Sequence, residues 1–394
     1  MGNVPPLRFP EFTEEWKAEQ LDNIATLSKG IGISKEQLSE DGEPCILYGE
    51  LYTKYKSEII KQVESKTDIN GSKLKRSKAN DVIIPCSGET AVDIATARCV
   101  PFDNILFGGD LNVISLHQYD GAFMSYQLNG KRKYDIARVA QGVSIVHLYG
   151  EHLKAIKTYN PTLPEQQKIA KLLSLLDDRI DTQNKIIEDL KKLKSAISKQ
   201  VFAQEPNGWC RLDTLFSKGK AGGTPTSTNK EYYNGEIPFL SINDITKQGK
   251  YVRYTENHLS QSGLENSSAW VVPKYSLIMS MYASVGLVTI NEIPTTTSQA
   301  MFAMQLKDKG LLDYLYYYLS YFKYRYIHKY LETGTQSNIN ADIIRGIMIP
   351  IYGHSRNMEI ASTLQGIDVK IDNELSVLKL FNKQKNYLLS QMFI

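Results

Sequence analysis

The sequence predicts an α+β protein with two mixed α/β globular domains, separated by two long antiparallel helices that form a coiled coil within the chain. Three observations predict this fold. The chain repeats itself at a constant offset, each copy ends in a long segment with coiled-coil periodicity, and the rest of each copy contains short β-branched runs bounded by turn residues. A pseudo-two-fold internal repeat follows, and 394 residues suffice for domains of this kind.

The internal repeat becomes visible when the sequence is shifted by 191 positions. Leu21-Asp22 then aligns with Leu212-Asp213, and Gln200-Val201-Phe202 aligns with Gln391-Met392-Phe393. The same offset holds without a gap from about Glu151 to the end of the chain. The protein is therefore two copies of one unit, each a variable globular part followed by a helix.

Each copy ends in about 40 residues whose apolar positions alternate in steps of four and three, which is the seam of a coiled coil. A helix of that length measures roughly 60 Å. Two seams in the same phase within one chain favour pairing inside the chain over dimerisation between chains. The predicted helix–helix interface consists of Ile169, Leu173, Leu176, Ile180, Ile187, Leu190, Ile360, Leu364, Ile367, Ile371 and Leu378.

The helices divide the chain into four expected parts. They are a first globular domain (1–160), a first helix (161–206), a second globular domain (207–353) and a second helix (354–394). Short β-branched runs predict strands at 45–48, 81–84 and 111–114, and in the second domain at 237–240, 276–279 and 300–304. Each domain closes with a tyrosine-bearing helix, 122–139 or 311–331, and a glycine-containing loop, 141–143 or 333–335.

Composition limits the possible classes of protein. The formal net charge is only +3, from 46 Lys+Arg and 43 Asp+Glu, which excludes a polybasic protein but allows a basic patch. Cys45, Cys86, Cys99 and Cys210 form no Cys-x-x-Cys pair, which argues against a zinc ribbon or a disulfide framework. The most apolar stretch, Tyr275–Ile290, is shorter than the ~20 residues that span a bilayer. A cytoplasmic protein without a membrane segment is expected.

The sequence contains no constellation that predicts catalysis. Asn160-Pro161-Thr162-Leu163 lacks the second proline and the aromatic residue of an adenine-methyltransferase loop. Gly219-Lys220-Ala221 fails at the third position of a phosphate-binding loop. His147 and His152 have no acidic partner at helical spacing, which argues against a metal pair. We therefore expect no catalytic residue, no metal ligand and no cofactor in this chain.

Features typical of nucleic-acid binding are present. Residues 54–78 hold eight basic and three acidic side chains with tyrosines interleaved, and lysines of this kind neutralise phosphates. In the second domain, the corresponding basic features are a glycine-rich loop at 218–226 and a late helix. The alternative interpretations are that the basic segment is only a solvated loop, and that the tyrosines belong to the core. The candidate DNA-binding residues are Tyr48, Tyr52, Lys54, Tyr55, Lys56, Lys73, Lys75, Arg76, Lys78, Lys218, Lys220, Gly222, Gly223, Thr224, Thr226, Lys323 and Arg325.

Three motifs resemble those of the DNA-specificity subunits of type I restriction-modification enzymes. Pro161-Thr162-Leu163-Pro164-Glu165-Gln166-Gln167-Lys168-Ile169-Ala170 is similar to the Pro-x-Leu-x-Glu-Gln-x-x-Ile-Ala start of the family's first conserved helix. The opening Leu7-Arg8-Phe9-Pro10-Glu11-Phe12, followed by Trp16, and the string Gly222-Gly223-Thr224-Pro225 also resemble the family. The second helix departs from the pattern, with Ser355-Arg356-Asn357-Met358 where Pro-x-Glu-Gln would stand.

The resemblance implies two target-recognition domains, each reading one half of a split, asymmetric site in double-stranded DNA. It also implies helices that set the spacer between the half-sites and dock two methyltransferase subunits. S-adenosylmethionine would come with those subunits, and ATP and Mg with restriction subunits, so the chain itself would do no chemistry. Two rival hypotheses are a stand-alone DNA methyltransferase or nuclease, and a coiled-coil adaptor without a DNA role.

Overall fold

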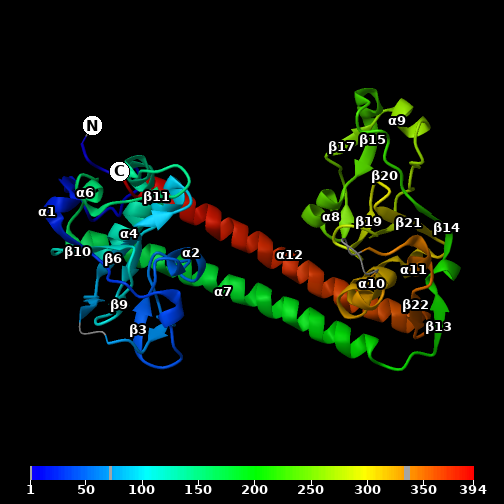
Figure 1. Cartoon of the computed structure of the whole chain (residues 1–394), viewed down its shortest axis with the longest axis horizontal. Helices are drawn as coiled ribbons and strands as arrows, with labels where there is room; N and C mark the ends of the chain where they lie inside the picture. The colour runs from blue at the N-terminus through cyan, green and yellow to red at the C-terminus, as the bar shows by residue number, and fades with distance from the viewer. Residues whose placement is uncertain (1, 71–72, 332–337) are drawn as a thin grey trace. The chain divides into compact units, whose positions relative to one another are not determined.

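The computed structural model of the chain describes residues 2–70, 73–331 and 338–394 (Figure 1). The chain forms two compact units. The first comprises 1–185 and 375–394, and the second comprises 186–374. Each unit thus combines one globular part with a portion of both long helices, α7 (Leu163–Phe202) and α12 (His354–Gln391). The predicted glycine loop at 333–335 lies outside the described residues.

The globular part of the first unit is built on two sheets. The larger is antiparallel, in the order β2 (Ala25–Lys29), β10 (Leu111–Leu116), β6 (Asp81–Pro85) and β8 (Arg98–Val100). The smaller has the order β4 (Lys66–Thr67), β3 (Glu43–Ile46), β9 (Leu106–Phe107) and β5 (Lys75–Arg76), with β3 and β9 parallel. The β-branched runs predict these central strands because both faces of β6 and β10 are covered: Val82, Ile83, Ile84 and Val113 are fully buried.

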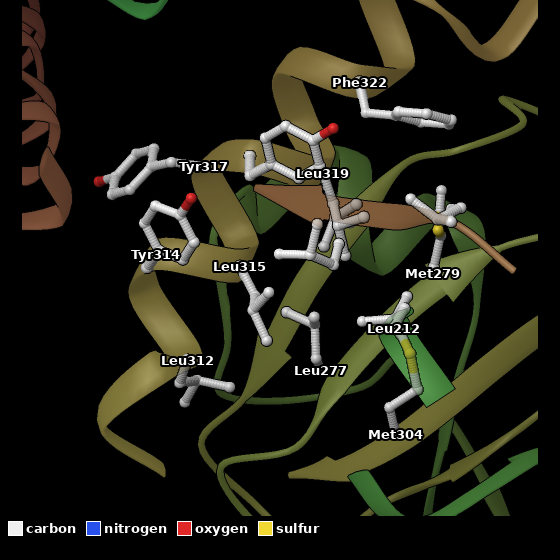
Figure 2. Packing of buried hydrophobic residues seen from close by; sticks show 14 of the residues in the cluster. Leu212, Leu277, Met279, Met304, Leu312, Tyr314, Leu315, Tyr317, Leu319 and Phe322 are labelled. Carbon is white, nitrogen blue, oxygen red and sulfur yellow. The ribbon is translucent and has the colours of Figure 1, made fainter. Parts of the chain in front are cut away.

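The second unit repeats this plan with additions. Its larger sheet has the order β14 (Phe216–Ala221), β21 (Met301–Leu306), β18 (Leu277–Ser280), β19 (Val288–Asn291) and β16 (Tyr251–Val252). The smaller sheet is β17 (Asn257–Leu259), β15 (Tyr233–Leu240) and β20 (Thr296–Thr297), again with one parallel pair. Figure 2 shows how Leu312, Leu315 and Leu319 of α10 (Leu312–Arg325) pack over the strand residues Leu277 and Met279.

Two short antiparallel pairs close the globular parts, and smaller helices complete them. The pairs are β1 (Lys17–Gln20) with β12 (Lys157–Asn160), and β13 (Gly208–Arg211) with β22 (Met348–Ile351). The remaining helices and one further strand pair are α1 (Leu21–Ile24), α2 (Glu50–Thr53), α3 (Ala91–Ile94), α4 (Gly121–Asn129), α5 (Lys133–Val139), α6 (Gly150–Lys154), α8 (Ile242–Gln248), α9 (Gln261–Glu265), α11 (Ala341–Arg345), β7 (Ser87–Gly88) and β11 (Val146–His147). The single helix predicted at 122–139 is wrong: α4 ends at Asn129, Gly130 caps it, and α5 begins at Lys133.

The internal repeat is confirmed at the level of structure. The first residues of β1 and β13, of β2 and β14, of α4 and α10, and of β12 and β22 are each 191 positions apart. The spacing changes in the middle, where β18 begins 196 residues after β6 and β21 begins 190 residues after β10. The elements that begin and end each globular part therefore keep the offset, while insertions and deletions shift the central strands between them.

The two long helices are antiparallel in each unit. In the first unit, Ile169 and Leu173 near the start of α7 share a buried cluster with Met392 and Phe393 at the end of the chain. In the second unit, Phe202 at the end of α7 shares a cluster with residues near the start of α12, namely Ile360, Ala361 and Leu364. All the predicted seam residues are buried or half-buried, as the alternating spacing requires.

The Glu-Gln pair at the start of α7 ties the helix to the rest of its unit. Glu165 is fully buried and accepts hydrogen bonds from Arg8 Nε at 2.7 Å and from Trp16 Nε1 at 3.3 Å. The Gln166 side chain accepts from the Asp120 backbone N–H and donates to the Pro161 carbonyl. The motif is therefore structural: it fixes the N-terminal arm and α4 against α7.

The departure from this motif at the second helix leaves the helix start unchanged. α12 begins at His354, which is 191 positions after Leu163. Asn357 takes the place of Gln166, is buried, and its side-chain oxygen accepts from the Tyr352 backbone N–H at 3.2 Å. The shorter amide side chain of Asn357 thus accepts a backbone hydrogen bond, as Gln166 does at the start of α7.

Candidate nucleic-acid interface

The predicted basic segment of the first unit is divided among several places. Tyr48 and Tyr52 line one cleft, whereas Lys75 and Lys78 line a separate hollow. Tyr55 is only 8% exposed and packs in the core, so its prediction as a surface contact is wrong. It was misassigned because its lysine neighbours face solvent while its own ring turns inward.

Other members of the segment are engaged inside the unit. Arg76 donates to both carboxylate oxygens of Glu43, at 2.6 and 3.0 Å, which lowers the pKa of Glu43 through that hydrogen-bonded contact. Lys54 pairs with Glu50 at 2.7 Å, and Lys56 donates to the Tyr52 carbonyl. Of the predicted cations here, Lys73 and Lys78 are exposed and Lys75 is half-buried.

A cleft of about 720 Å³ lies in the first unit. Its walls come from α2, from β7 and Glu89, from Asp93 of α3 and Arg98 of β8, and from Ser144 and Ile145. The Tyr52 hydroxyl donates to the Ser87 carbonyl at 3.0 Å and its pKa is raised by burial, so it stays a neutral donor. A Cβ at Gly88 would lie 3.0 Å from that hydroxyl, so glycine permits the close approach.

The cleft combines a buried cation with exposed acceptors. Arg98 is buried, its Nε donates to the Tyr55 carbonyl at 3.0 Å, and burial lowers its pKa below the ordinary value. Glu89 and Asp93 are exposed on the same walls, beside the ring of Tyr48. Carboxylates accept from the cytosine amino group, so Glu89 and Asp93 suit contact with base edges. The Arg98 guanidinium is bonded to the Tyr55 and Ala97 carbonyls and serves the structure of the cleft wall.

The second hollow of the first unit, about 320 Å³, suits phosphate contact. Lys75 and Lys78 line it together with Thr26 and His117, whose side chains hydrogen-bond at 2.8 Å. Ser28 Oγ, also in its lining, is buried without a hydrogen-bond partner. Cations and hydroxyls of this kind bind the sugar-phosphate backbone without reading sequence.

In the second unit, the first four residues of the predicted flexible basic loop, 218–221, belong to strand β14, and 222–226 lie outside it. Lys218 and Lys220 lie on β14, at the edge of the larger sheet, and their side chains are exposed. Lys218 Nζ lies 4.2 Å from the centroid of the Trp270 ring, and Lys220 Nζ donates to the Ser268 carbonyl. The glycines misled the prediction, because glycine is more typical of loops than of strands.

Gly222 and Gly223 do not offer free backbone donors. Their N–H groups donate to Met301 and Thr297 carbonyls, at 3.0 and 2.9 Å. A Cβ at either position would come within 2.3 Å of another segment's backbone, so the glycines serve close packing. Thr224 and Thr226 of the same string are exposed, and they remain candidates for contact with DNA.

Two loops that the sequence analysis missed occupy equivalent places in the two units. The Leu148 N–H donates to the Cys86 carbonyl at 2.8 Å, and the Ile339 N–H donates to the Met281 carbonyl at 3.1 Å. These contacts make the turn after β6 equivalent to the turn after β18, which carries the exposed Tyr282. The available signal was the small and polar residues directly after each buried strand.

The turn after β18 also lies beside the predicted cations of α10. Ala283 and Ser284 have φ of 38° and 52°, so the turn is held in the left-handed region. A Cβ at Gly286 would lie 3.2 Å from the Lys323 side chain, and burial lowers the pKa of Lys323. Arg325 is exposed on the same helix, so this region combines an aromatic ring, a tight turn and a free guanidinium group.

The long helices carry exposed apolar residues away from their seam. In the first unit, Leu175 and Phe381 line an open groove of about 440 Å³ together with Arg179 and Thr182. Spacings of 11 and 7 residues keep side chains on one face of a helix. The exposed apolar residues with such spacings are Leu175, Ile186 and Leu193 on α7 and Met358, Val369, Leu380 and Tyr387 on α12.

Among the described residues, no group of three or more His, Cys, Asp and Glu side chains is arranged to hold a metal ion. Burial raises the pKa of the Cys45 and Cys86 thiols to about 11, and that of Cys99 to about 12. In the same part of the chain, no helix is both long and apolar enough to cross a membrane.

Comparison with known proteins gives one consistent match. The family model described as "Type I restriction modification DNA specificity domain" matches residues 13–192 and again residues 206–378. The MjaIX specificity subunit of Methanocaldococcus jannaschii is 26% identical over 178 residues, which are 44% of this chain and 40% of that protein. The HindI specificity subunit of Haemophilus influenzae is 30% identical over 137 residues, 34% of this chain and 29% of that protein.

Solved structures share the fold. The S subunit of a type I restriction-modification system from M. genitalium superposes with a TM-score of 0.63 at 17% identity, covering 99% of both chains. A chain from a structural study of complex assembly in a type I system gives a TM-score of 0.61 at 16% identity, covering 98% of this chain and 99% of that one. The sequence matches span only 29–54% of the length of the curated relatives.

Proposed function

Because the chain belongs to the type I restriction-modification DNA specificity family, we propose that it is the sequence-reading subunit of such a complex. Each unit would recognise one half of a bipartite, asymmetric site in double-stranded DNA. The observation that carries this proposal is the contrast between framework and surface. The strands and helices that begin and end each globular part keep the repeat offset, whereas the clefts, turns and basic residues differ between the two units.

The recognition contacts would divide by chemistry. In the first unit, the base-reading groups would be the exposed side chains of the large cleft, Tyr48, Glu89 and Asp93, and the phosphate contacts would be Lys75 and Lys78. In the second unit, the contacts with DNA would come from Tyr282, Arg325 and the exposed lysines of β14. Two different surfaces on one architecture explain how one chain can read two different half-sites.

The long helices would have two further tasks. Their length would set the number of unread base pairs between the half-sites. The exposed apolar groove around Leu175 and Phe381 would receive a methyltransferase subunit, and the repeat provides for two such subunits. Those subunits would bring S-adenosylmethionine, and restriction subunits would bring ATP and Mg, so this chain would act in the cytoplasm without catalysis of its own.

An exchange of one unit's surface tests the proposal. Trp209 and Pro350 are directly paired across β13 and β22, so a segment cut at these residues has adjacent ends. Replacing Trp209–Pro350 with the matching segment of another family member should change one half of the methylated site and leave the other unchanged. Ala18 and Tyr159 are paired in the same way across β1 and β12, so exchanging Ala18–Tyr159 is the matched control and should change the other half.

The outcomes separate the rival functions. Changes in both halves after either exchange would contradict independent recognition by two units. S-adenosylmethionine turnover by the isolated chain would establish a stand-alone methyltransferase instead. Sequence-independent DNA binding by the assembled complex would favour a coiled-coil adaptor.

A further inference from the structure

We propose that two repeat-related clusters of tyrosine, aspartate and lysine are positioning residues that fix each globular part on the helix pair and thereby restrict the spacers that the protein accepts. We call them latch 1 (Tyr126, Asp177 and Lys385) and latch 2 (Tyr317, Asp368 and Lys194). The inference rests on the proposed function, since it concerns how tightly the half-sites are held at one separation.

Latch 1 joins three elements of the first unit. The Tyr126 hydroxyl of α4 donates to Asp177 Oδ2 of α7 at 2.6 Å. Lys385 Nζ of α12 lies 2.7 Å from Asp177 Oδ1, and 5.8 Å from the centroid of the Tyr126 ring. One aspartate therefore connects the globular part to one long helix by a hydrogen bond, and to the other by an ion pair.

Latch 2 makes the same contacts in the second unit. The Tyr317 hydroxyl of α10 donates to Asp368 Oδ2 of α12 at 2.8 Å. Lys194 Nζ of α7 lies 2.5 Å from Asp368 Oδ1, and 5.2 Å from the centroid of the Tyr317 ring. In Figure 2 the Tyr317 hydroxyl points away from the buried leucines of the sheet.

The two latches are equivalent under the internal repeat. Tyr126 and Tyr317, Asp177 and Asp368, and Lys194 and Lys385 are each separated by 191 positions. The aspartate is on α7 and the lysine on α12 in latch 1, and these helices are exchanged in latch 2. The same three-way contact is thus built twice, although the surfaces that would read DNA differ between the units.

Their surroundings show that the shared feature is geometry and not a common degree of burial. In latch 1 the Asp177 and Lys385 side chains are 4% and 14% exposed, and Glu58 adds a second carboxylate 2.5 Å from Lys385 Nζ. In latch 2 the Lys194 and Asp368 side chains are 29% and 24% exposed, and Lys250 Nζ reaches the Tyr317 hydroxyl at 3.1 Å. Desolvation offsets much of the Coulomb energy of buried ion pairs, whereas their directional contacts still fix orientation.

Loss of a latch hydroxyl should therefore loosen orientation without altering the surfaces that would contact bases. Tyr126 lines neither the large cleft nor the basic hollow of the first unit. Tyr317 lines a hollow of the second unit together with Lys194 and Asp368, and none of that unit's proposed DNA contacts lies in it. A globular part that can tilt on the helices should accept half-sites at neighbouring separations. The half-site sequences themselves should stay the same.

The test uses the full chain assembled with its methyltransferase subunits. Tyr126→Phe, Tyr317→Phe and the double variant each remove only hydroxyl groups. The matched controls are Tyr119→Phe and Tyr251→Phe, which remove hydroxyls bonded to Glu19 at 2.9 Å and Asp313 at 3.0 Å within the globular parts. Methylation rates are measured on duplexes with the wild-type half-sites at the natural spacer and at one base pair more or less.

We expect the preference for the natural spacer to fall about 10-fold in the double variant, which is about 1.4 kcal/mol, because each globular part loses the hydrogen bond that ties it to an aspartate of a long helix. The controls should stay within twofold of wild type. Lys194→Arg should keep the preference, since it preserves the cation, and Lys194→Gln should lower it.

Each result decides between positioning and general stability. A lower melting temperature or a lower overall rate with an unchanged spacer preference would overturn the proposal. A preference lost equally in the controls would do the same. Failure of the proposed function is distinguishable, because the wild-type complex would then show no sequence preference at any spacer.

Discussion

Removing one heptad from each long helix should shorten the preferred spacer by about three base pairs. The change deletes Asn184–Leu190 from α7 and Leu375–Phe381 from α12, which are equivalent under the repeat. The remaining seam residues keep their alternating spacing of four and three. All six latch residues lie outside the deleted segments.

The magnitude follows from helix geometry. Seven residues at ~1.5 Å each remove roughly 10.5 Å from helices of 40 and 38 residues. Three base pairs at ~3.4 Å each span about 10 Å. A heptad changes the phase of a straight helix by only ~20°, whereas three base pairs turn by roughly 100°. Affinity should therefore drop even though the preferred spacer follows the length.

The assay is modified-base sequencing of a host that carries the variant chain and its methyltransferase subunits. Both half-sites should be retained and the number of bases between them should decrease. The matched control exchanges the two heptads, so that 184–190 and 375–381 trade places while helix length stays constant; it should keep the original spacer. Active complexes of the deletion variant that still methylate the original spacer would refute the ruler, and the helices would then serve for docking alone.

Two further predictions concern charge. Lys75→Ala with Lys78→Ala should weaken binding to all DNA sequences and reduce the salt slope of log K by about 0.9 per lost phosphate contact, while Arg76→Ala should change the slope less because Arg76 pairs with Glu43. An unchanged slope in the double variant, measured by titration at several salt concentrations, would place this hollow away from DNA. Burial, reinforced by Asp177, raises the pKa of Tyr126 above its usual 10, so its stabilising effect is complete below pH 10 and is lost as pH rises above that value. Above pH 10 the free energy of unfolding should therefore fall by about 1.4 kcal/mol per pH unit more steeply in wild type than in Tyr126→Phe; equal slopes in urea titrations would contradict the burial of this phenol.

Periodicity explains which parts of the fold the sequence predicted. The repeat, the seam from Ile169 onward and the central strands at β6 and β10 were predictable because each depends on a local pattern of apolar residues. The break between α4 and α5 at Gly130 was missed, since the tyrosine-rich pattern continues through it.

The candidate site was less predictable because it depends on contacts between distant segments. Nothing local indicates that Tyr55 turns inward, or that Arg76 is engaged by Glu43. The latches are the clearest example: Asp177 lies near the middle of the chain and Lys385 near its end, and only the fold brings them together. The repeat offset could have aligned each residue of latch 1 with its equivalent in latch 2, but it could not show that the residues within one latch are in contact.

Recognition of a bipartite site by this chain is tested by the methylome of a host that carries it together with its methyltransferase subunits, compared with the same host lacking the chain. We expect one motif that appears only with the chain and consists of two different half-sites separated by a fixed number of unread bases. A continuous motif, two identical half-sites, or the same methylation without the chain would contradict it.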